Sequence, residues 1–271
     1  MPAVLITGAG RGIGRAIAER LSAAGWDVYA GVRSGEAPAG TTAVRLDVTS
    51  AEDIAALDDA LPERLDAVVN NAGIAIGGPV EGVPLEEVRR QFEVNVTAPI
   101  AVTQAVMPRL RASRGRVVFV SSVSGRVSTP LTGVYNASKF AIEGLADAMR
   151  MEVRPWGVRV VLVEPAQTDT DMWRGMEAEL DATVASLSPE QRELYAKHTA
   201  GFRRMIPISL KLSSPAEGVA ATVEKALTTS RPKARYVVGI GPRIQAVMSG
   251  LTPTPVLDAA LSRALGIPRK A

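Results

Sequence analysis

Short runs of apolar residues alternate with longer segments of helical period along most of the 271-residue chain. This alternation is typical of βαβ units, in which helices connect parallel strands. The predicted strands share a near-continuous apolar character and cover Ala3–Thr7, Asp27–Arg33, Ala43–Asp47, Asp66–Asn70, Arg116–Ser121, Val158–Val163 and Arg235–Val238. Such strands are buried on both faces, so the pattern predicts an α/β fold with a doubly wound parallel sheet, in one domain over residues 1–271.

Helices are predicted between these strands, over Gly12–Ala24, Leu85–Ala112 and Tyr135–Val153, with Thr49 or Ser50 capping a further one. Two regions interrupt the alternation. Ala166–Ser213 follows the sixth strand, at the end of the sheet where ligands bind in open α/β folds, and is predicted to be a lid over the substrate. The tail, residues 241–271, carries a short apolar helix, Val256–Leu265, which we expect to be buried against another subunit rather than a membrane.

Composition narrows the possible chemistry. A hydrophobic content of 46% and a charged content of 22% are those of a soluble globular protein, and the net charge of +3 comes without a run of Lys or Arg, so no nucleic-acid partner is expected. The chain has no Cys and one His, His198, which excludes disulfides and thiolate chemistry and makes a metal site improbable. No basic leader and no membrane-length apolar stretch are seen, so a cytoplasmic protein is expected.

A glycine-rich segment, Thr7–Gly14, connects the first strand to its helix. Its glycines Gly8, Gly12 and Gly14 allow a tight turn close to a pyrophosphate, and the N–H groups that begin the helix attract that anion. This spacing departs from the G-x-G-x-x-G fingerprint, so the position between strand and helix supports a dinucleotide site more than the motif does.

The second strand ends without the carboxylate that normally binds the ribose diol of NAD(H). Arg33 stands there instead, and Arg11 approaches from the glycine-rich segment. Because a guanidinium can bind a 2′-phosphate, the sequence favours NADP(H) over NAD(H), although a solvated arginine at a strand end is the alternative. Asp47, followed by Val48, ends the third strand, where a carboxylate could accept a hydrogen bond from the adenine amino group.

The fourth strand ends in Asn70-Asn71-Ala72-Gly73, where small residues leave room for a flat ring. This segment and Asp47 could equally be turn residues. We assign them to the cofactor site because they fall at successive carboxyl ends of one predicted sheet.

Tyr135 and Lys139 are four residues apart on a predicted helix, so their side chains share one face, and Ser122 lies thirteen residues upstream of the tyrosine. A phenol has an ordinary pKa of about 10 and carries protons poorly at neutral pH. A nearby ammonium favours the phenolate, so we expect Lys139 to lower the pKa of Tyr135 and make it a general acid/base.

Asn95 lies four residues before Pro99, which lacks the N–H that would bond the Asn95 carbonyl. If one helix continues through this segment, it kinks and the freed carbonyl needs another donor, for which a water linked to Lys139 would serve. The alternative is that Asn95 ends one helix before a second begins at Pro99.

Together these motifs resemble the short-chain dehydrogenase/reductase family in order and spacing: Thr7–Gly14, Asp47, Asn70–Gly73, Asn95, Ser122, Tyr135 and Lys139, over residues 1 to about 170. The resemblance implies a Rossmann-like seven-stranded sheet, assembly as a homodimer or homotetramer, and reversible hydride transfer between a nicotinamide cofactor and an alcohol or carbonyl. It also implies a role for each member of the catalytic set. Tyr135 would be the proton donor, Ser122 would position the substrate oxygen, Lys139 would hold the nicotinamide ribose, and Asn95 would complete a proton relay.

One segment departs from the family pattern. Where the family commonly has Pro-Gly after the sixth strand, this chain has Pro165-Ala166, so the backbone there is expected to differ if the glycine needs a positive φ. Thr168 and Thr170 are both candidates to contact the cofactor.

The lid carries Met, Trp and aromatic side chains, although such residues more often belong to a core. Together with Arg126–Val134 before Tyr135 they favour a lipophilic alcohol or ketone, and the sequence resembles the branch that holds hydroxysteroid and retinol dehydrogenases. Two alternatives are weighed. A non-catalytic NADP(H)-binding regulatory protein would be expected to lose a member of the Asn-Ser-Tyr-Lys set, and all four are present. A sugar-nucleotide epimerase or dehydratase usually has a longer chain and different glycine spacing.

Overall fold

Seven parallel strands form a single sheet, as predicted, and their order is β3-β2-β1-β4-β5-β6-β7. The computed structural model describes residues 1–239 and 250–267. The strands are β1 (Ala3–Thr7), β2 (Asp27–Val32), β3 (Thr42–Arg45), β4 (Ala67–Asn70), β5 (Arg116–Val120), β6 (Arg159–Glu164) and β7 (Arg235–Val237). The strand order reverses between β1 and β4, because β2 and β3 lie on one side of this point and β5 to β7 on the other. In parallel sheets such a reversal leaves a crevice at the carboxyl ends of the two strands.

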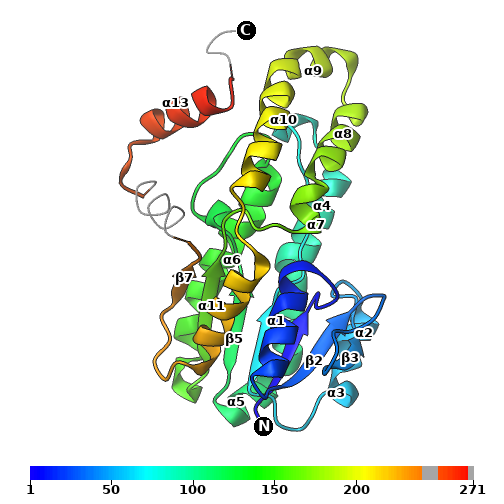
Figure 1. Ribbon diagram of the computed structural model, residues 1–271, viewed down its shortest axis with the longest axis vertical. Coiled ribbons are helices and arrows are strands. Elements are labelled where there is room, and N and C mark those ends of the chain that lie inside the picture. The colour runs from blue at the N-terminus through cyan, green and yellow to red at the C-terminus, as the bar shows by residue number, and fades with distance from the viewer. Residues whose placement is uncertain (240–249, 268–271) are drawn as a thin grey trace.

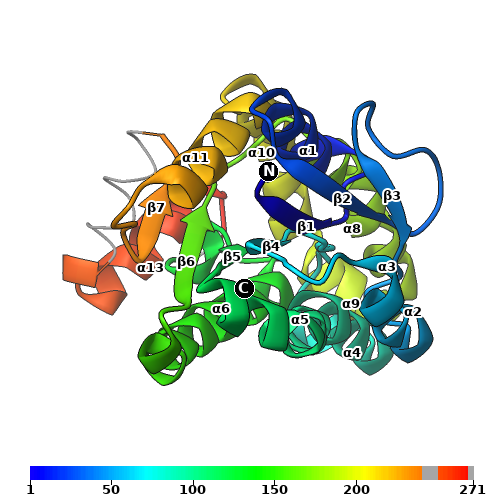
Figure 2. The same cartoon turned by 90° about the horizontal axis from the view of Figure 1, so that it is seen from below.

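Helices cover both faces of the sheet (Figure 2). One face packs against α1 (Gly12–Ala23) and α11 (Ala216–Thr228) through side chains such as Ile17, Leu21 and Val223, none of which is exposed. The other face packs against α3 (Leu57–Ala60), α5 (Ala98–Ser113) and α6 (Gly133–Glu152). Burial on both faces explains why the strands are apolar at almost every position.

The predicted helix Leu85–Ala112 is one helical run in three parts: α4 (Leu85–Phe92), a π-helical segment η2 (Glu93–Thr97) and α5. The residues that flank the π turn keep right-handed helical angles, with φ −72° and ψ −38° at Phe92 and φ −61° and ψ −47° at Ala98. The helix therefore continues past Pro99 instead of ending before it, and the missing N–H is absorbed by a wider turn at Asn95.

Shorter elements connect these layers: α2 (Ala51–Ala55), η1 (Val80–Gly82), η3 (Val123–Gly125) and η4 (Arg154–Trp156). Of the two predicted caps, Ser50 begins α2, because its side chain accepts from the Asp53 N–H. The helix predicted to begin at Tyr135 starts two residues earlier, at Gly133.

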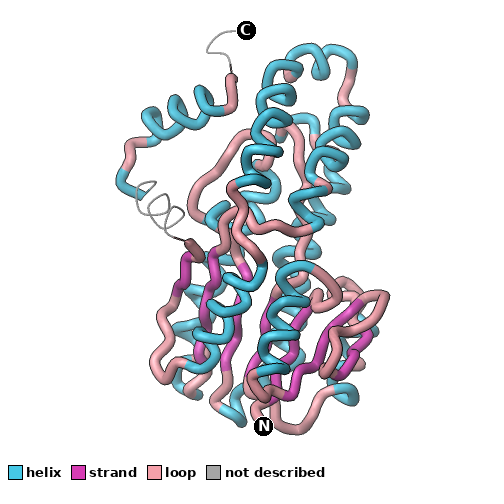
Figure 3. The backbone as a smooth tube through the Cα atoms, viewed as in Figure 1, coloured by secondary structure: helices cyan, strands magenta, loops and turns pink. Residues whose placement is uncertain are grey.

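A helical layer rises beyond the carboxyl ends of the strands (Figures 1 and 3). It consists of α7 (Asp171–Arg174), α8 (Met176–Ser186), α9 (Pro189–Leu194) and α10 (Ala196–Lys211), which together fill the predicted lid region 166–213. The last described helix, α13 (Thr254–Ala264), approaches α10 where Gly201 lies against the Leu265 carbonyl. Parts of the predicted tail, 241–249 and 268–271, lie outside the described residues.

Candidate active site

A cavity of about 1260 Å³ lies between the carboxyl ends of the strands and the helical layer. Nearly all of the predicted site residues line it, with the exception of Gly14 and Asn95. Those lining it are Gly8, Arg11, Gly12, Ile13, Arg33, Asp47, Val48, Asn71, Ala72, Gly73, Ser122, Tyr135, Lys139, Pro165, Thr168 and Thr170. Residues from six strand ends thus meet in one space, which is the arrangement that open parallel sheets use to bind ligands.

The glycine-rich turn needs its glycines for two different reasons. Gly8 and Gly12 have φ values of +66° and +54°, a left-handed conformation that favours glycine. Gly14 lies behind the cavity, where a Cβ would come within 2.2 Å of the Gly8 carbonyl oxygen and 2.4 Å of the Asn71 amide nitrogen. The turn is therefore closed tightly enough to leave its backbone N–H groups beside a cradle that a pyrophosphate can enter.

Thr7 and Asn71 join this turn to the loop after β4. The Thr7 hydroxyl accepts from the backbone N–H groups of Asn71 and Ala72, each at 3.0 Å. The Asn71 side chain donates in return to the Thr7 and Gly8 carbonyl oxygens, at 3.0 and 3.2 Å. The amide nitrogen of Asn71 is therefore engaged with the protein, and its part in the site is to hold the glycine turn.

Ser122, Tyr135 and Lys139 converge on the floor of the cavity. Ser122 follows β5, is 8% exposed, and its hydroxyl donates to the Pro165 carbonyl at 3.4 Å and accepts from the Ser124 N–H at 3.1 Å. The Lys139 ammonium lies 5.8 Å from the Tyr135 ring centre and donates to the Val120 carbonyl at 3.0 Å. Val120 was not anticipated, since its contribution is a backbone oxygen that no side-chain pattern reports.

Burial dominates the acid–base behaviour of both groups. It raises the pKa of the Tyr135 phenol, and the hydrogen bond with Ser122 opposes the rise. It also lowers the pKa of Lys139 to about 8, against the charge of Glu143, which raises it. The expectation of a Tyr135 pKa below its ordinary value is therefore wrong for this structure, because desolvation of the phenol raises the pKa by more than its surroundings lower it. The phenol is protonated at neutral pH and is ready to donate.

Asn95 is 2% exposed and lies behind the cavity wall. Its side-chain oxygen accepts from the Ile74 N–H at 2.9 Å, and its nitrogen donates to the Ile74 carbonyl at 2.9 Å and to the Ser138 hydroxyl at 3.1 Å. The side chain thus bridges the loop after β4 to α6, the helix of Tyr135 and Lys139. A relay through Asn95 would have to use its backbone carbonyl.

Charged and hydroxyl groups line the cavity beside the glycine-rich turn and at the ends of β2 and β3. Asp47 accepts from the N–H and hydroxyl of Thr49, and these bonds, with the nearby charge of exposed Arg33, lower its pKa. Arg11 is also exposed and lies 4.0 Å from Asp171. The two arginines thus stand on the rim of the cavity with their guanidinium groups accessible to solvent.

The segment after β6 separates the two threonine candidates. Thr170 packs beside Gly12, since a Cβ there would lie 3.4 Å from its methyl group, whereas the Thr168 hydroxyl donates to the Ala166 carbonyl at 3.1 Å. Among the described non-glycine residues only Arg114 and Leu131 have positive φ. Ala166 therefore sits in this turn without the strain that replacing a positive-φ glycine would cause.

The lid helices line the rest of the cavity with mainly apolar side chains, although Asp171, Glu179 and Ser209 also line it. Met172, Trp173, Met176, Phe202, Met205 and Ile206 line it from the lid helices, and Leu261, Ala264 and Leu265 from α13 and its end. The contribution of α13 was not foreseen, because its amphipathic pattern does not tell which surface its apolar side covers. His198 lies outside the lining, beside the Tyr195 ring, with 5.1 Å between ring centres.

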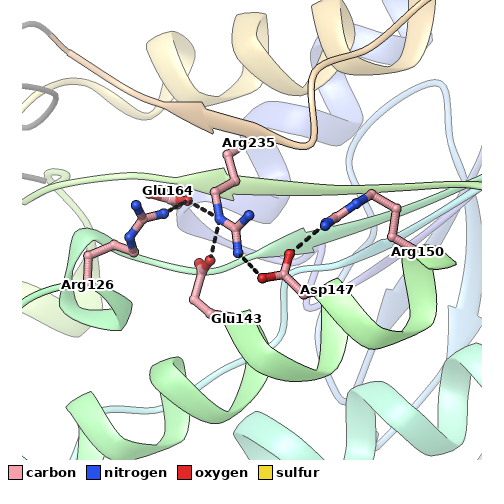
Figure 4. A network of polar contacts seen from close by, with 6 residues as sticks. All are labelled: Arg126, Glu143, Asp147, Arg150, Glu164 and Arg235. Carbon is pink, nitrogen blue, oxygen red and sulfur yellow. Dashed lines mark hydrogen bonds and ion pairs between the residues drawn. The ribbon is translucent and has the colours of Figure 1, made fainter. Parts of the chain in front are cut away.

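Two further structural observations bear on the site. The described residues contain no cluster of three or more His, Asp or Glu side chains able to hold a metal, and none of their helices is long and apolar enough to cross a membrane. A group of partly buried charges ties α6 to the last two strands (Figure 4), and the sequence analysis did not anticipate it because its members come from distant segments.

Comparisons with known proteins agree with this geometry. The family model of short chain dehydrogenases matches residues 2–181. The chain is 34% identical to the NADPH-dependent 3-dehydrocapnine reductase of Ornithobacterium rhinotracheale, with 94% of each chain covered, and 31% identical to retinol dehydrogenase 5 of Mus musculus, covering 96% of this chain and 87% of that one. Its fold is similar to the crystal structure of a short chain dehydrogenase from Burkholderia cenocepacia in complex with NADP, with a TM-score of 0.75, 25% identity and coverage of 96% and 97%.

Proposed function

Because the chain belongs to the short-chain dehydrogenase/reductase family and is an NAD(P)-dependent oxidoreductase acting on CH–OH and carbonyl groups, we propose that it uses NADP(H) to interconvert a lipophilic alcohol and its ketone or aldehyde. One observation carries the proposal: Ser122, Tyr135 and Lys139 converge between a glycine turn shaped for a pyrophosphate and an apolar chamber. A carbonyl in that chamber and a dinucleotide on that turn would meet at the phenol.

The residues on the cavity floor divide the work of proton transfer. Tyr135, a phenol that is protonated at neutral pH and whose pKa burial raises further, gives its proton to the substrate oxygen during reduction and takes it back during oxidation. Ser122, whose hydroxyl is fixed by Ser124 and Pro165, holds that oxygen by a hydrogen bond. When bound, the nicotinamide supplies or accepts the hydride.

Lys139 and Asn95 support that step. The Lys139 ammonium is held by the Val120 carbonyl and has further N–H groups for the ribose hydroxyls, and its positive charge stabilises the phenolate that forms when Tyr135 gives up its proton. The Asn95 carbonyl, at the π turn, is the proposed acceptor for a water that links Lys139 to solvent.

The preference for NADP(H) is proposed from Arg33 and Arg11, which line the end of the cavity beside β2 and the glycine turn. Both are exposed and able to bind a 2′-phosphate, whereas an acidic residue at the position of Arg33 would repel one. The NADPH-dependent relative supports this assignment. Thr170, beside Gly12, is the proposed hydroxyl donor to the phosphates.

We propose a lipophilic substrate because the lid lines the cavity with thioether, indole and aliphatic side chains such as Met172, Trp173 and Ile206. The similarity to a retinol dehydrogenase supports it. Assembly as a homodimer or homotetramer and a cytoplasmic location stay predictions, and sedimentation of the purified protein would measure the first.

The test is a substitution of the phenol. Tyr135→Phe removes one hydroxyl and should lower kcat for reduction of an aliphatic or steroidal ketone by about a thousandfold or more, while the Kd for NADPH changes little. Tyr195→Phe is the control, because Tyr195 lies outside the cavity lining. It should leave both kcat and the Kd for NADPH unchanged. Normal turnover by Tyr135→Phe would overturn the mechanism. Tight NADPH binding without turnover of any carbonyl by the unmodified protein would favour the regulatory alternative.

A further inference from the structure

Six charged residues form a partly buried cluster between α6 and the last two strands (Figure 4). Three come from α6 and the others from the loop after η3, the end of β6 and the start of β7: Glu143, Asp147 and Arg150, then Arg126, Glu164 and Arg235. Arg235 is the centre of the cluster, since it lies 3.0 Å from Glu143, 2.7 Å from Asp147 and 3.4 Å from Glu164. The proton-transfer step proposed above uses none of these groups.

We propose that Glu143, held in place by Arg235, is a positioning residue that keeps the Lys139 ammonium charged and fixed at the floor of the cavity. The inference rests on the proposed function, because it assigns Glu143 a role through Lys139 in that same site.

The first support is the position of the two residues. Glu143 follows Lys139 by one helical turn on α6, and both are buried, at 6% and 8% exposure. Within the described structure they form no direct ion pair, so the carboxylate acts through space. A charge acts strongly over such a distance here, because little water lies between buried groups to screen it.

The second support is that Glu143 is held rigidly. One carboxylate oxygen accepts a hydrogen bond from Arg235 Nε at 3.0 Å. On the side of the Ser122 loop, a Cβ added to Gly125 would lie 2.9 Å from Glu143 Cγ and 3.1 Å from the Lys139 carbonyl, so the loop packs closely on both residues. The other oxygen, Oε1, is buried and accepts no hydrogen bond from the described residues. A buried, half-satisfied carboxylate is costly, and an electrostatic role toward Lys139 accounts for it.

The remaining charges around Glu143 decide how the role can be tested. Arg235, Arg126 and Arg150 carry positive charge, and Asp147 and Glu164 carry negative charge. The pKa of Glu164 is raised to about 7 by burial and then by Glu143, so Glu164 also titrates near neutral pH. Asp147 shares Arg235 with Glu143 but lies a further turn from Lys139, with a side chain 39% exposed. It is therefore the matched control for a merely structural role.

The experiment follows the titration of Lys139 by NMR in protein with 13C-labelled lysine and without cofactor, and Lys139→Arg assigns the signal. Burial already brings the pKa of Lys139 to about 8, and Glu143 opposes that effect. Glu143→Gln should therefore move the titration to lower pH, whereas Asp147→Asn should leave it in place. Equal titrations in Glu143→Gln and the unmodified protein, or equal shifts in both variants, would overturn the proposal.

A second variant serves if Glu143→Gln does not fold, and its expected effect has the opposite sign. Arg235→Gln removes a cation that partly neutralises Glu143, so the titration of Lys139 should move to higher pH. A downward or absent shift in Arg235→Gln would also overturn the proposal.

The functional readout is the pH dependence of kcat for ketone reduction with NADPH. In Glu143→Gln the decline of kcat at high pH should begin earlier, so that kcat near pH 8.5, normalised to its value at neutral pH, is about threefold or more below that of the unmodified protein, while Glu143→Asp restores much of it. The same alkaline profile as the unmodified protein would count against the proposal. Because the NMR titration needs neither cofactor nor substrate, it stays decisive even if no carbonyl is reduced, a result that would instead refute the proposed function.

Discussion

At the scale of single residues, Arg33 is the side chain on which the coenzyme assignment depends. It is exposed at the end of β2, lines the cavity, and is close enough to lower the pKa of Asp47 by its charge. A guanidinium in that place can bind a phosphate by charge-assisted hydrogen bonds, but it gains nothing from a ribose diol. The two nicotinamide coenzymes should therefore respond differently to its removal.

We expect Arg33→Ala to weaken NADPH binding by about ten- to a hundredfold and to leave NADH binding nearly unchanged. Fluorescence titration of each coenzyme measures the two dissociation constants. Arg45→Ala is the control, because Arg45 is an exposed arginine on neighbouring β3 that does not line the cavity. An equal loss for both coenzymes would contradict the 2′-phosphate assignment.

The residues that sequence reasoning could place are those whose chemistry depends on side-chain type and local spacing. Tyr135 and Lys139 share a helix face four positions apart, and the glycines of the first turn stand between a strand and a helix. The sign of the change in the Tyr135 pKa could not be predicted in the same way, because it depends on how much protein surrounds the phenol. Burial of that kind is a property of the assembled fold.

At the scale of elements, the predicted strands and long helices were confirmed, with ends displaced by a few residues. Their apolar periods are strong signals because they reflect burial against the sheet. The π turn was expected as a kink, since Pro99 withholds an N–H from Asn95, although its form could not be read from the sequence. The position of α13 could not be predicted at all, because it depends on contacts with α10, which is distant in the sequence.

The helix α13 closes part of the apolar chamber, and this supports a role in substrate binding in addition to the subunit contact predicted for it. Leu261→Asp would place a charge against an apolar ligand, so KM for a lipophilic ketone should rise by about tenfold or more while the Kd for NADPH stays the same. Val256→Asp, on an exposed part of α13, is the control. Steady-state kinetics with a long and a short ketone measures the effect, and an unchanged KM for the long one would remove α13 from the site.

At the scale of the whole molecule, the charge cluster joins three elements that are separate in the sequence and adjacent in the fold. Glu164 ends β6, Arg235 begins β7, and Glu143 lies on α6. The short strand β7 is thus held to the sheet by ion pairs as well as by its hydrogen bonds to β6. Contacts of this range leave no local pattern, which is why the sequence analysis gave none of the three an electrostatic role.

The raised pKa of Glu164 makes stability depend on pH. Its ordinary value is 4.5 and its folded value is about 7, so between these the native state binds more protons than the unfolded state and stability falls as pH rises. Glu164→Gln should remove this contribution. Its stability relative to the unmodified protein should therefore increase from about pH 4.5 to 7, by up to about 3 kcal/mol, and then level off.

Urea unfolding at several pH values measures this difference. The exposed carboxylate of Glu217 on α11 provides the control, because Glu217→Gln should give a curve parallel to that of the unmodified protein. A Glu164→Gln curve that is also parallel would show that Glu164 does not titrate in this range.

The hydroxyl of Thr7 has a consequence for how variants of this protein should be judged. Valine has almost the same shape and would fill the same buried space, so most measures of substitution severity rank that exchange as mild. Here it would remove the acceptor of the Asn71 and Ala72 backbone N–H groups, at the point where the strand order of the sheet reverses. A single oxygen atom, which hardly changes the shape or the volume of the side chain, therefore sets the tolerance of this position.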